Sequence, residues 1–282
     1  MIFVSSSCIK NKYIWESVEK LANLGYKNIE LSGGTERSSS IFSNLKKIKN
    51  KYSLNFRCHN YFPPPKKHFV MNLASDSEII YKNTSALINE ALELSRKLES
   101  KEYGFHAGFL TDISPKEIGK SIKAKNLSER KDAIKRFNQR IIDIVKKNRD
   151  IKIYVENNVL SKNNFQNFNK ENPFLLTSFE DINQLSKDFE FNIILDVAHL
   201  FVSCTSLNLD FQDQFRKFIL LSDYIHISDN NGLSDQNKRL KKNSEIFNAL
   251  KNANLQKKTF TIEVNNDLNG IKHTYETLQD LI

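Results

Sequence analysis

The chain has 282 residues, of which 39% are hydrophobic and 27% are charged, so it can bury a large core and is not a disordered chain. Its 8 glycines and 5 prolines are too few for a low-complexity or fibrous protein. The net charge of +9 would suit a nucleic-acid or phosphate partner, but lysines are spread along the whole chain, which favours biased composition over a dedicated binding patch.

Targeting and disulfide signals are absent from the sequence. Residues 1–5 carry no basic leader, and no window approaches the roughly 18 consecutive apolar residues of a membrane span. Cys8, Cys58 and Cys204 lie far apart without C-x-x-C spacing, which argues against a disulfide framework or a thiolate zinc site. We therefore expect a cytoplasmic protein with no membrane partner, and the sequence leaves homo-oligomerisation open.

Short β-branched runs alternate with longer helical patterns along the chain. In chain order the predicted strands are Ile2–Ser5, Asn28–Leu31, Leu54–Cys58, Tyr103–His106, Ile151–Glu156, Phe191–Asp196, Tyr224–Ile227 and Thr259–Val264. The clearest helix runs from about Ser77 to Leu98, where apolar residues recur at spacings of four and three. Ser114-Pro115-Lys116-Glu117 and Ser178-Phe179-Glu180-Asp181 each predict a helix start with an N-cap serine.

The alternation of these elements predicts the fold class. Eight strand–helix units over 282 residues average about 35 residues each. Strands that alternate with helices form a parallel sheet, and eight units allow the sheet to close into a (β/α)8 TIM barrel, an α/β fold. A doubly wound open sheet is the alternative, but no G-x-G-x-x-G follows the first strand. Without a visible linker or repeat, residues 1–282 are predicted to form a single domain.

Ionisable residues mark the ends of the predicted strands. They are Glu30, His59, His106, Glu156, Asp196, His226 and Glu263, followed in nearby loops by His199, Asp229 and Asp235. In a barrel all strand ends point to one mouth, where the active site is built, so these residues should converge. Several carboxylates around one mouth repel each other unless a cation is present, which predicts a metal site.

Four of these residues are predicted to hold one divalent metal ion, because they end strands five to eight and are neighbours around the barrel. They are Glu156, Asp196, His226 and Glu263. Carboxylates and imidazole without a thiol suit Mn, Zn, Co, Fe or Mg, and the sequence does not choose among these metals.

Around these residues the chain resembles the xylose-isomerase-like barrel superfamily, which includes sugar isomerases and epimerases and the apurinic-site endonucleases of the endonuclease IV type. The segment 25–32 is similar to the second strand of the isomerases, and His59 with the segment 71–75 is similar to a metal-binding segment of the endonucleases. Phe105-His106-Ala-Gly108, Val155-Glu156-Asn157, Leu195-Asp196-Val-Ala-His199, Ile225-His226-Ile-Ser-Asp229 and Ile262-Glu263 are similar to further ligand motifs. The seven segments stand in the order that the superfamily has, over nearly the whole chain.

The resemblance implies a metal-dependent enzyme, and the preferred activity is a sugar or sugar-phosphate isomerase or epimerase. In that branch Glu156 and Glu263 would pass a proton at carbon, and His199 would hydrogen-bond a substrate oxygen. Two residues favour this branch: Glu30, and Asn237, which stands where the endonucleases carry a histidine for a third metal. Substrate contacts are expected from Glu30, His59, His106, Lys66, Lys67 and Asp229.

The alternative is an endonuclease IV-like phosphodiesterase that cleaves DNA at apurinic sites with two or three metals. His59, His106 and Asp235 match extra ligands of the endonucleases and would form a second metal site. The net charge of +9 favours this activity. A third interpretation is a barrel that has lost catalysis, and the complete set of four predicted ligands argues against it.

Overall fold

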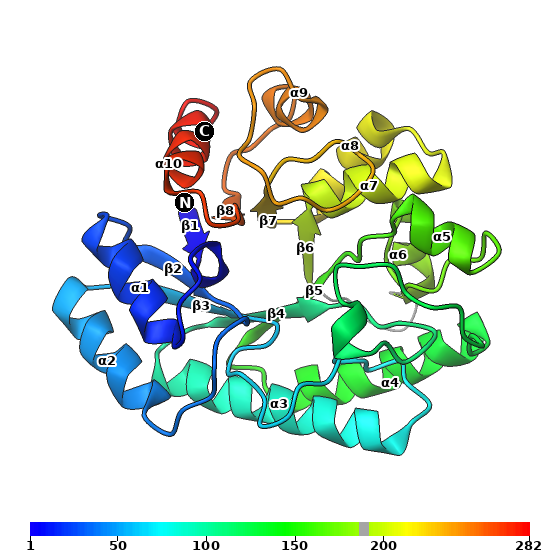
Figure 1. Ribbon diagram of the computed structural model, residues 1–282, viewed down its shortest axis with the longest axis horizontal. Coiled ribbons are helices and arrows are strands. Elements are labelled where there is room, and N and C mark those ends of the chain that lie inside the picture. The colour runs from blue at the N-terminus through cyan, green and yellow to red at the C-terminus, as the bar shows by residue number, and fades with distance from the viewer. Residues whose placement is uncertain (186–191) are drawn as a thin grey trace.

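Eight parallel strands close into one barrel in sequence order (Figure 1). The computed structural model describes residues 1–185 and 192–282. The strands are β1 (Ile2–Ser5), β2 (Asn28–Leu31), β3 (Asn55–His59), β4 (Glu102–His106), β5 (Lys152–Glu156), β6 (Asn192–Asp196), β7 (Tyr224–Ile227) and β8 (Thr259–Ile262). The prediction of a (β/α)8 TIM barrel is therefore confirmed.

Helices surround the strands on the outside of the barrel (Figure 1). In the described ranges they are α1 (Ile14–Asn23), α2 (Ile41–Tyr52), α3 (Glu78–Lys97), α4 (Arg130–Lys147), α5 (Lys162–Asn167), α6 (Phe179–Leu185), α7 (Val197–Leu207), α8 (Phe211–Leu221), α9 (Glu245–Lys251) and α10 (Leu268–Gln279). The predicted helix near Ser77 is α3, whose first turn is capped by the Ser77 hydroxyl. None of the helices described is long and apolar enough to cross a membrane.

Strand ends differ from the predicted bounds by one or two residues. β3 extends through His59, so this histidine belongs to the strand, whereas β8 stops at Ile262 and Glu263 follows it. Phe191, the predicted start of the sixth strand, lies outside the described residues. These shifts do not alter which residues reach the mouth, because strand ends are followed directly by loops on the same face.

One of the two predicted helix starts is correct. Helix α6 begins at Phe179, directly after Ser178. By contrast, Ser114 caps only a three-residue 3-10 helix (Pro115–Glu117), and the next α-helix begins at Arg130. Gly119 follows with φ of +69°, a backbone conformation that ends a right-handed helix. The capping signal was therefore local, and it did not start an α-helix.

Alternation along each strand separates an apolar outer core from a polar barrel interior. Along β5, Ile153 and Val155 pack in the main apolar core, whereas Tyr154 joins a separate cluster with Ile194 and Tyr224. Glu156, two residues after Tyr154, points to the same side as that tyrosine and reaches the mouth. The polar residues of the mouth thus stand on the barrel's inner face.

The bottom of the barrel contains a buried cation. Arg57, on β3, is 9% exposed and forms an ion pair with Glu102 at the start of β4. Its guanidinium carbon lies 4.6 Å from the ring centre of Phe3 and 4.2 Å from that of Tyr224, both cation–π distances. This group is two residues below His59 on the same strand, so it lies deeper in the barrel than the mouth.

Candidate metal centre

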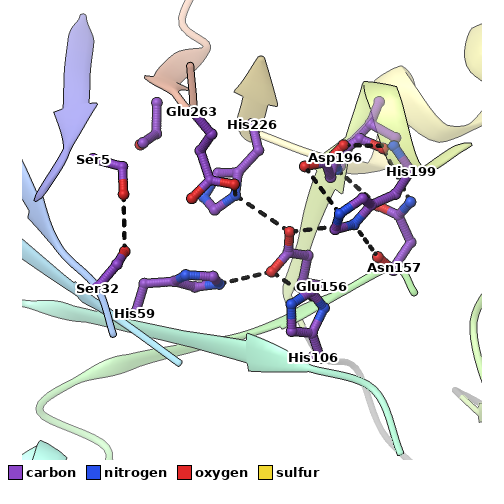
Figure 2. Close-up of polar contacts among 12 residues, drawn as sticks. Ser5, Ser32, His59, His106, Glu156, Asn157, Asp196, His199, His226 and Glu263 are labelled. Atoms are coloured by element: carbon purple, nitrogen blue, oxygen red, sulfur yellow. Dashed lines mark hydrogen bonds and ion pairs between the residues drawn. The ribbon is translucent and has the colours of Figure 1, made fainter. Parts of the chain in front are cut away.

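The Glu156 carboxylate lies at the centre of the mouth and is fully buried (Figure 2). His59 Nε2 is 2.7 Å from Glu156 Oε2, and His106 Nδ1 is 3.5 Å from the same oxygen. On the other side, His226 Nδ1 is 3.3 Å and His199 Nδ1 is 3.6 Å from Oε1. Each oxygen of this one carboxylate therefore faces its own pair of imidazoles.

The four side chains predicted to hold one metal ion come together as their strand order requires. Glu156, Asp196, His226 and Glu263 each offer a ligand atom, and these atoms all lie within 4.8 Å of one another. His106, Glu156 and His199 form another such group within the same distance. These two groups share Glu156, and a third group joins Glu30, His59, His226 and Glu263.

Charge in the mouth is balanced by the histidines. Burial by itself would raise the pKa of Glu156, but the nearby His106, His59 and His226 hold it well below its usual range. Burial raises the pKa of Asp196 to about 7, and the neighbouring Glu156 and Asp235 charges add to this effect. Burial also opposes charge on His226, yet Glu30, Glu263 and Glu156 raise its pKa well above the usual value. Without a cation, protons on imidazole therefore compensate the carboxylates.

Several buried polar atoms in the mouth suit a bound cation. Glu156 Oε1, Asp196 Oδ2, His226 Nδ1 and His106 Nδ1 have no hydrogen-bond partner within residues 1–185 and 192–282. An unsatisfied buried polar atom costs about 1–3 kcal/mol, so four in one place need an explanation. Oxygen and imidazole nitrogen are normal ligands of divalent metals, and a cation would satisfy all four atoms. The residues present therefore fit a divalent metal.

The D-x-x-H segment is held by the start of helix α7. Asp196 caps this helix, because its Oδ1 accepts from the backbone N–H of His199 at 2.7 Å, and its Oδ2 is left toward the mouth. Asn157 ties this turn to β5, since its Oδ1 accepts from the Asp196 N–H at 2.8 Å and its Nδ2 donates to the Asp196 carbonyl at 3.0 Å. Sequence reasoning did not single out Asn157, although its place beside Glu156 was a signal.

The three residues expected to form a second metal site divide between two places. His59 and His106, from β3 and β4, flank Glu156 Oε2. Asp235 instead lies in the loop after β7, where its Oδ2 is 3.4 Å from His199 Nε2. Asn237 Nδ2 donates to that same Asp235 oxygen at 3.4 Å. Asp235 thus pairs with His199 rather than with His59 and His106, because it reaches the mouth from the opposite side.

A family model described as xylose isomerase-like TIM barrel matches residues 18–281. The chain belongs to the xylose isomerase-like TIM barrel family. No curated protein sequence gives a significant match.

Solved structures of this family share the fold at low identity. A D-tagatose 3-epimerase-like protein has a TM-score of 0.73 at 19% identity over 99% of this chain and 96% of its own. Endonuclease IV from Thermus thermophilus has a TM-score of 0.63 at 14% identity over 99% of each chain. A 3-keto-D-glucoside 4-epimerase from E. coli has a TM-score of 0.65 at 13% identity over 99% of this chain and 98% of its own. At these identities the likeness establishes the barrel, and the activity must be argued from the site.

Two expected substrate contacts of this xylose isomerase-like barrel are placed unfavourably for that role. Glu30 is fully buried and already accepts hydrogen bonds inside the barrel. Asp229 is 3% exposed, and its side chain accepts from the backbone N–H groups of Asn230 and Lys241. Their oxygens accept these hydrogen bonds from the protein itself, and substrate contact by Glu30 and Asp229 stays a prediction.

The other expected contacts remain accessible or lie in the cluster. Lys66 and Lys67 are exposed in the loop between β3 and α3 and stay a prediction as phosphate contacts. His59 and His106 face Glu156, and their role as substrate contacts or metal ligands stays a prediction.

Asn72 joins two loops at the mouth of this family member. Its side chain is 2% exposed; Oδ1 accepts from the N–H groups of Ala74 and Phe109, each at 3.0 Å. Its Nδ2 donates to the Phe109 carbonyl at 3.0 Å and to Asp112 Oδ1 at 3.2 Å. The loops after β3 and β4 are thus fixed to each other beside the two histidines.

Proposed function

We propose that this chain is a divalent-metal-dependent phosphodiesterase that acts on DNA at apurinic sites. The observation that carries the proposal is the position of Glu156, whose two oxygens face separate imidazole pairs. A carboxylate placed in this way can bridge two cations, and two-metal sites are characteristic of phosphoryl-transfer hydrolases. When bound, such cations would polarise a phosphoryl oxygen and acidify a water molecule.

This proposal reverses the order of preference drawn from the sequence. Glu30 favoured the sugar isomerase, but its carboxylate already forms hydrogen bonds with Ser32, Thr261 and His226. Proton transfer at one metal would use Glu156 and Glu263 and would leave His59 and His106 as substrate contacts only. A site with two cations uses both histidines, so it accounts for more of the mouth.

The chain's own residues can bind a phosphodiester. His199 is held by Asp235 at 3.4 Å and by the Asn157 carbonyl at 3.0 Å, so its ring is fixed at the edge of the cluster. Exposed cations stand in two loops at the same end of the barrel: Lys66, Lys67, Lys238, Arg239, Lys241 and Lys242. These side chains would contact phosphates, and binding would weaken with salt.

The test is metal counting combined with cleavage of an abasic duplex. We expect about two metal equivalents per chain in the wild type and about one in the His59→Ala/His106→Ala double variant, with loss of cleavage. His68→Ala is the matched control, because His68 is an exposed histidine in the loop after β3. One equivalent in the wild type, unchanged by the double substitution, would contradict a two-metal site.

A sugar or sugar-phosphate isomerase or epimerase is the second candidate. It is favoured by the single group of Glu156, Asp196, His226 and Glu263, in which two glutamates could serve as the acid–base pair with His199 beside them. Incubation with ketoses and aldoses, free and phosphorylated, in heavy water tests it. Deuterium incorporation at carbon would favour this reaction, and its absence together with abasic-site cleavage would reject it.

The remaining predictions keep their status as proposals. The choice of metal among Mn, Zn, Co, Fe and Mg is one of these proposals, and location in the cytoplasm is another. Cys8, Cys58 and Cys204 are free and buried. We also infer that residues 1–282 form one domain, since strands from both ends of the chain pair as β1 and β8.

A further inference from the structure

Glu30 is a carboxylate enclosed inside the barrel directly beneath the mouth. Its side chain is fully buried, and its Oε2 lies 3.2 Å from His226 Nε2 and 3.2 Å from the Thr261 hydroxyl. Its Oε1 accepts from the Ser32 hydroxyl at 3.3 Å and lies 3.8 Å from His59 Nδ1. Every one of these partners comes from the barrel itself, so Glu30 acts on neighbouring side chains rather than on a substrate.

The surroundings of Glu30 hold it in one place. Ser32, which donates to it, also accepts from the Ser5 hydroxyl at 3.1 Å, as Figure 2 shows for this serine pair. Thr261 lies on β8 and Ser5 on β1, so hydroxyl groups from two other strands support the carboxylate, Thr261 directly and Ser5 through Ser32. A carboxylate fixed by hydroxyl donors can fix other groups in turn.

The contacts of Glu30 dictate which nitrogen of each imidazole faces the mouth. An ionised carboxylate only accepts hydrogen bonds, so His226 Nε2, at 3.2 Å, donates to Glu30. His226 then keeps Nε2–H toward Glu30 and presents Nδ1, which has no hydrogen-bond partner in the described part of the chain. His59 keeps Nδ1 on the Glu30 side and presents Nε2 toward Glu156.

We propose that Glu30 is a positioning residue that serves both candidate cation sites, orienting the His226 and His59 rings so that opposite ring nitrogens face the mouth. The proposal rests on the proposed function, because it needs the two histidines to be metal ligands. His226 belongs to the group with Asp196 and Glu263, His59 lies on the Oε2 side of Glu156, and both histidines also form a group with Glu30 and Glu263. One buried carboxylate therefore orients a ligand on each side of Glu156.

The expected effect follows from what such a carboxylate does for a ligand. It fixes the ring orientation and makes the imidazole a stronger donor to the metal, and loss of such a partner typically costs about 10–100-fold in metal affinity. Glu30→Gln keeps the size but removes the charge, and its amide offers one acceptor oxygen where the carboxylate offers two. Both cation sites should weaken, because one side chain supports both histidines.

The experiment measures metal affinity and the cobalt absorption spectrum of the full chain. Competition between the protein and a chromophoric chelator gives the affinity for Zn²⁺, and the d–d bands of bound Co²⁺ report the ligand geometry. We expect Glu30→Gln to lower affinity at both sites by about 10–100-fold and to change the Co²⁺ bands. Glu102→Gln is the matched control, since Glu102 pairs with Arg57 inside the same barrel and touches none of the mouth histidines among its ion-pair partners in the described residues.

Thr261→Val is a second variant that tests the role of Glu30 if Glu30→Gln does not fold. It removes one hydroxyl donor to Glu30 at nearly constant size, and the expected result is a smaller loss of affinity in the same direction. Metal affinity and Co²⁺ bands unchanged within about twofold in the variants that fold would overturn the role of Glu30, whatever happens to thermal stability. A wild type that binds no metal would instead overturn the proposed function, so the two failures are distinguishable.

Discussion

Arg57 offers a sharp test of how the barrel interior is stabilised. The substitution Arg57→Met keeps a long apolar side chain between Phe3 and Tyr224 but removes the charge that faces Glu102. Burial already raises the pKa of Glu102, so this carboxylate depends on its partner to stay ionised. The substitution therefore leaves a carboxylate unpaired in a largely buried position.

The magnitude follows from the burial of both partners. The side chains of Arg57 and Glu102 are 11% and 21% exposed, so solvent screens the pair only weakly. Removal of one partner from a buried pair costs about 3–5 kcal/mol. For a domain of this size each kcal/mol lowers Tm by about 2–4 °C, so we expect a decrease on the order of 10 °C.

Chemical denaturation of the metal-free protein, followed by circular dichroism, measures the change in the free energy of unfolding. The double variant Arg57→Met/Glu102→Gln should recover most of the loss, because no unpaired charge remains. Metal affinity should stay unchanged, since neither residue touches the candidate ligands. A loss below about 1 kcal/mol for Arg57→Met, or effects of the two substitutions that simply add, would refute the reasoning.

Three further predictions concern the mouth, the loops and the thiols. Metal affinity should fall as pH falls from 8 to 6, because the pKa values of His226 and His199 are raised and protons compete with the metal for these rings. The expected loss is up to about tenfold per pH unit for each proton displaced, and competition with a chelator measures it. Asn72→Ala should destabilise the protein by about 2 kcal/mol and speed proteolysis of the segment 107–129, as seen by denaturation and mass spectrometry. Native protein should not react with a thiol reagent, and denatured protein should show all three cysteines, because burial raises the pKa of Cys58 and Cys204 to about 12 and that of Cys8 still higher.

Each of these has a clear contrary result. Affinity that is flat between pH 6 and 8 would mean that no imidazole proton is displaced by the metal. An Asn72→Ala variant as stable and as protease-resistant as wild type would show that the two loops hold their positions independently. Rapid labelling of a native thiol would show that at least one cysteine is accessible.

The barrel and the convergence of the mouth residues could be predicted because both follow from sequence periodicity. Strand–helix alternation fixed the order of the strands, and closure then brought Glu156, Asp196, His226 and Glu263 together. Individual roles depend on depth and on irregular loops, which periodicity does not encode. Glu30 also ends a strand, yet it lies beneath its neighbours and is enclosed, so its residue type could not reveal its function.

Loops account for the other differences from the sequence predictions. Asp235 is only nine residues after His226, but the turn of the loop after β7 carries it to His199. Ser114 and Glu117 form the hydrogen bonds of a helix start, but the backbone is already extended at Ile118 (φ −60°, ψ 128°), so no α-helix follows. Local signals of this kind specify a turn, and the backbone conformation of the residues that follow decides whether an α-helix continues from it.

The central position of Glu156 has a thermodynamic consequence. One oxygen of this carboxylate faces His59 and the other faces His226. A cation bound at one oxygen would change the charge and the position of the other oxygen. With two cations, as proposed, the two binding events would be coupled, and the coupling free energy would be the same whichever cation arrives first. Such coupling free energies are typically about 1–3 kcal/mol. During a metal titration, positive coupling of this size would make the protein with one bound cation rare, and negative coupling would make it the main species. The supply of metal would then control activity through a cooperative step, and not through two independent affinities.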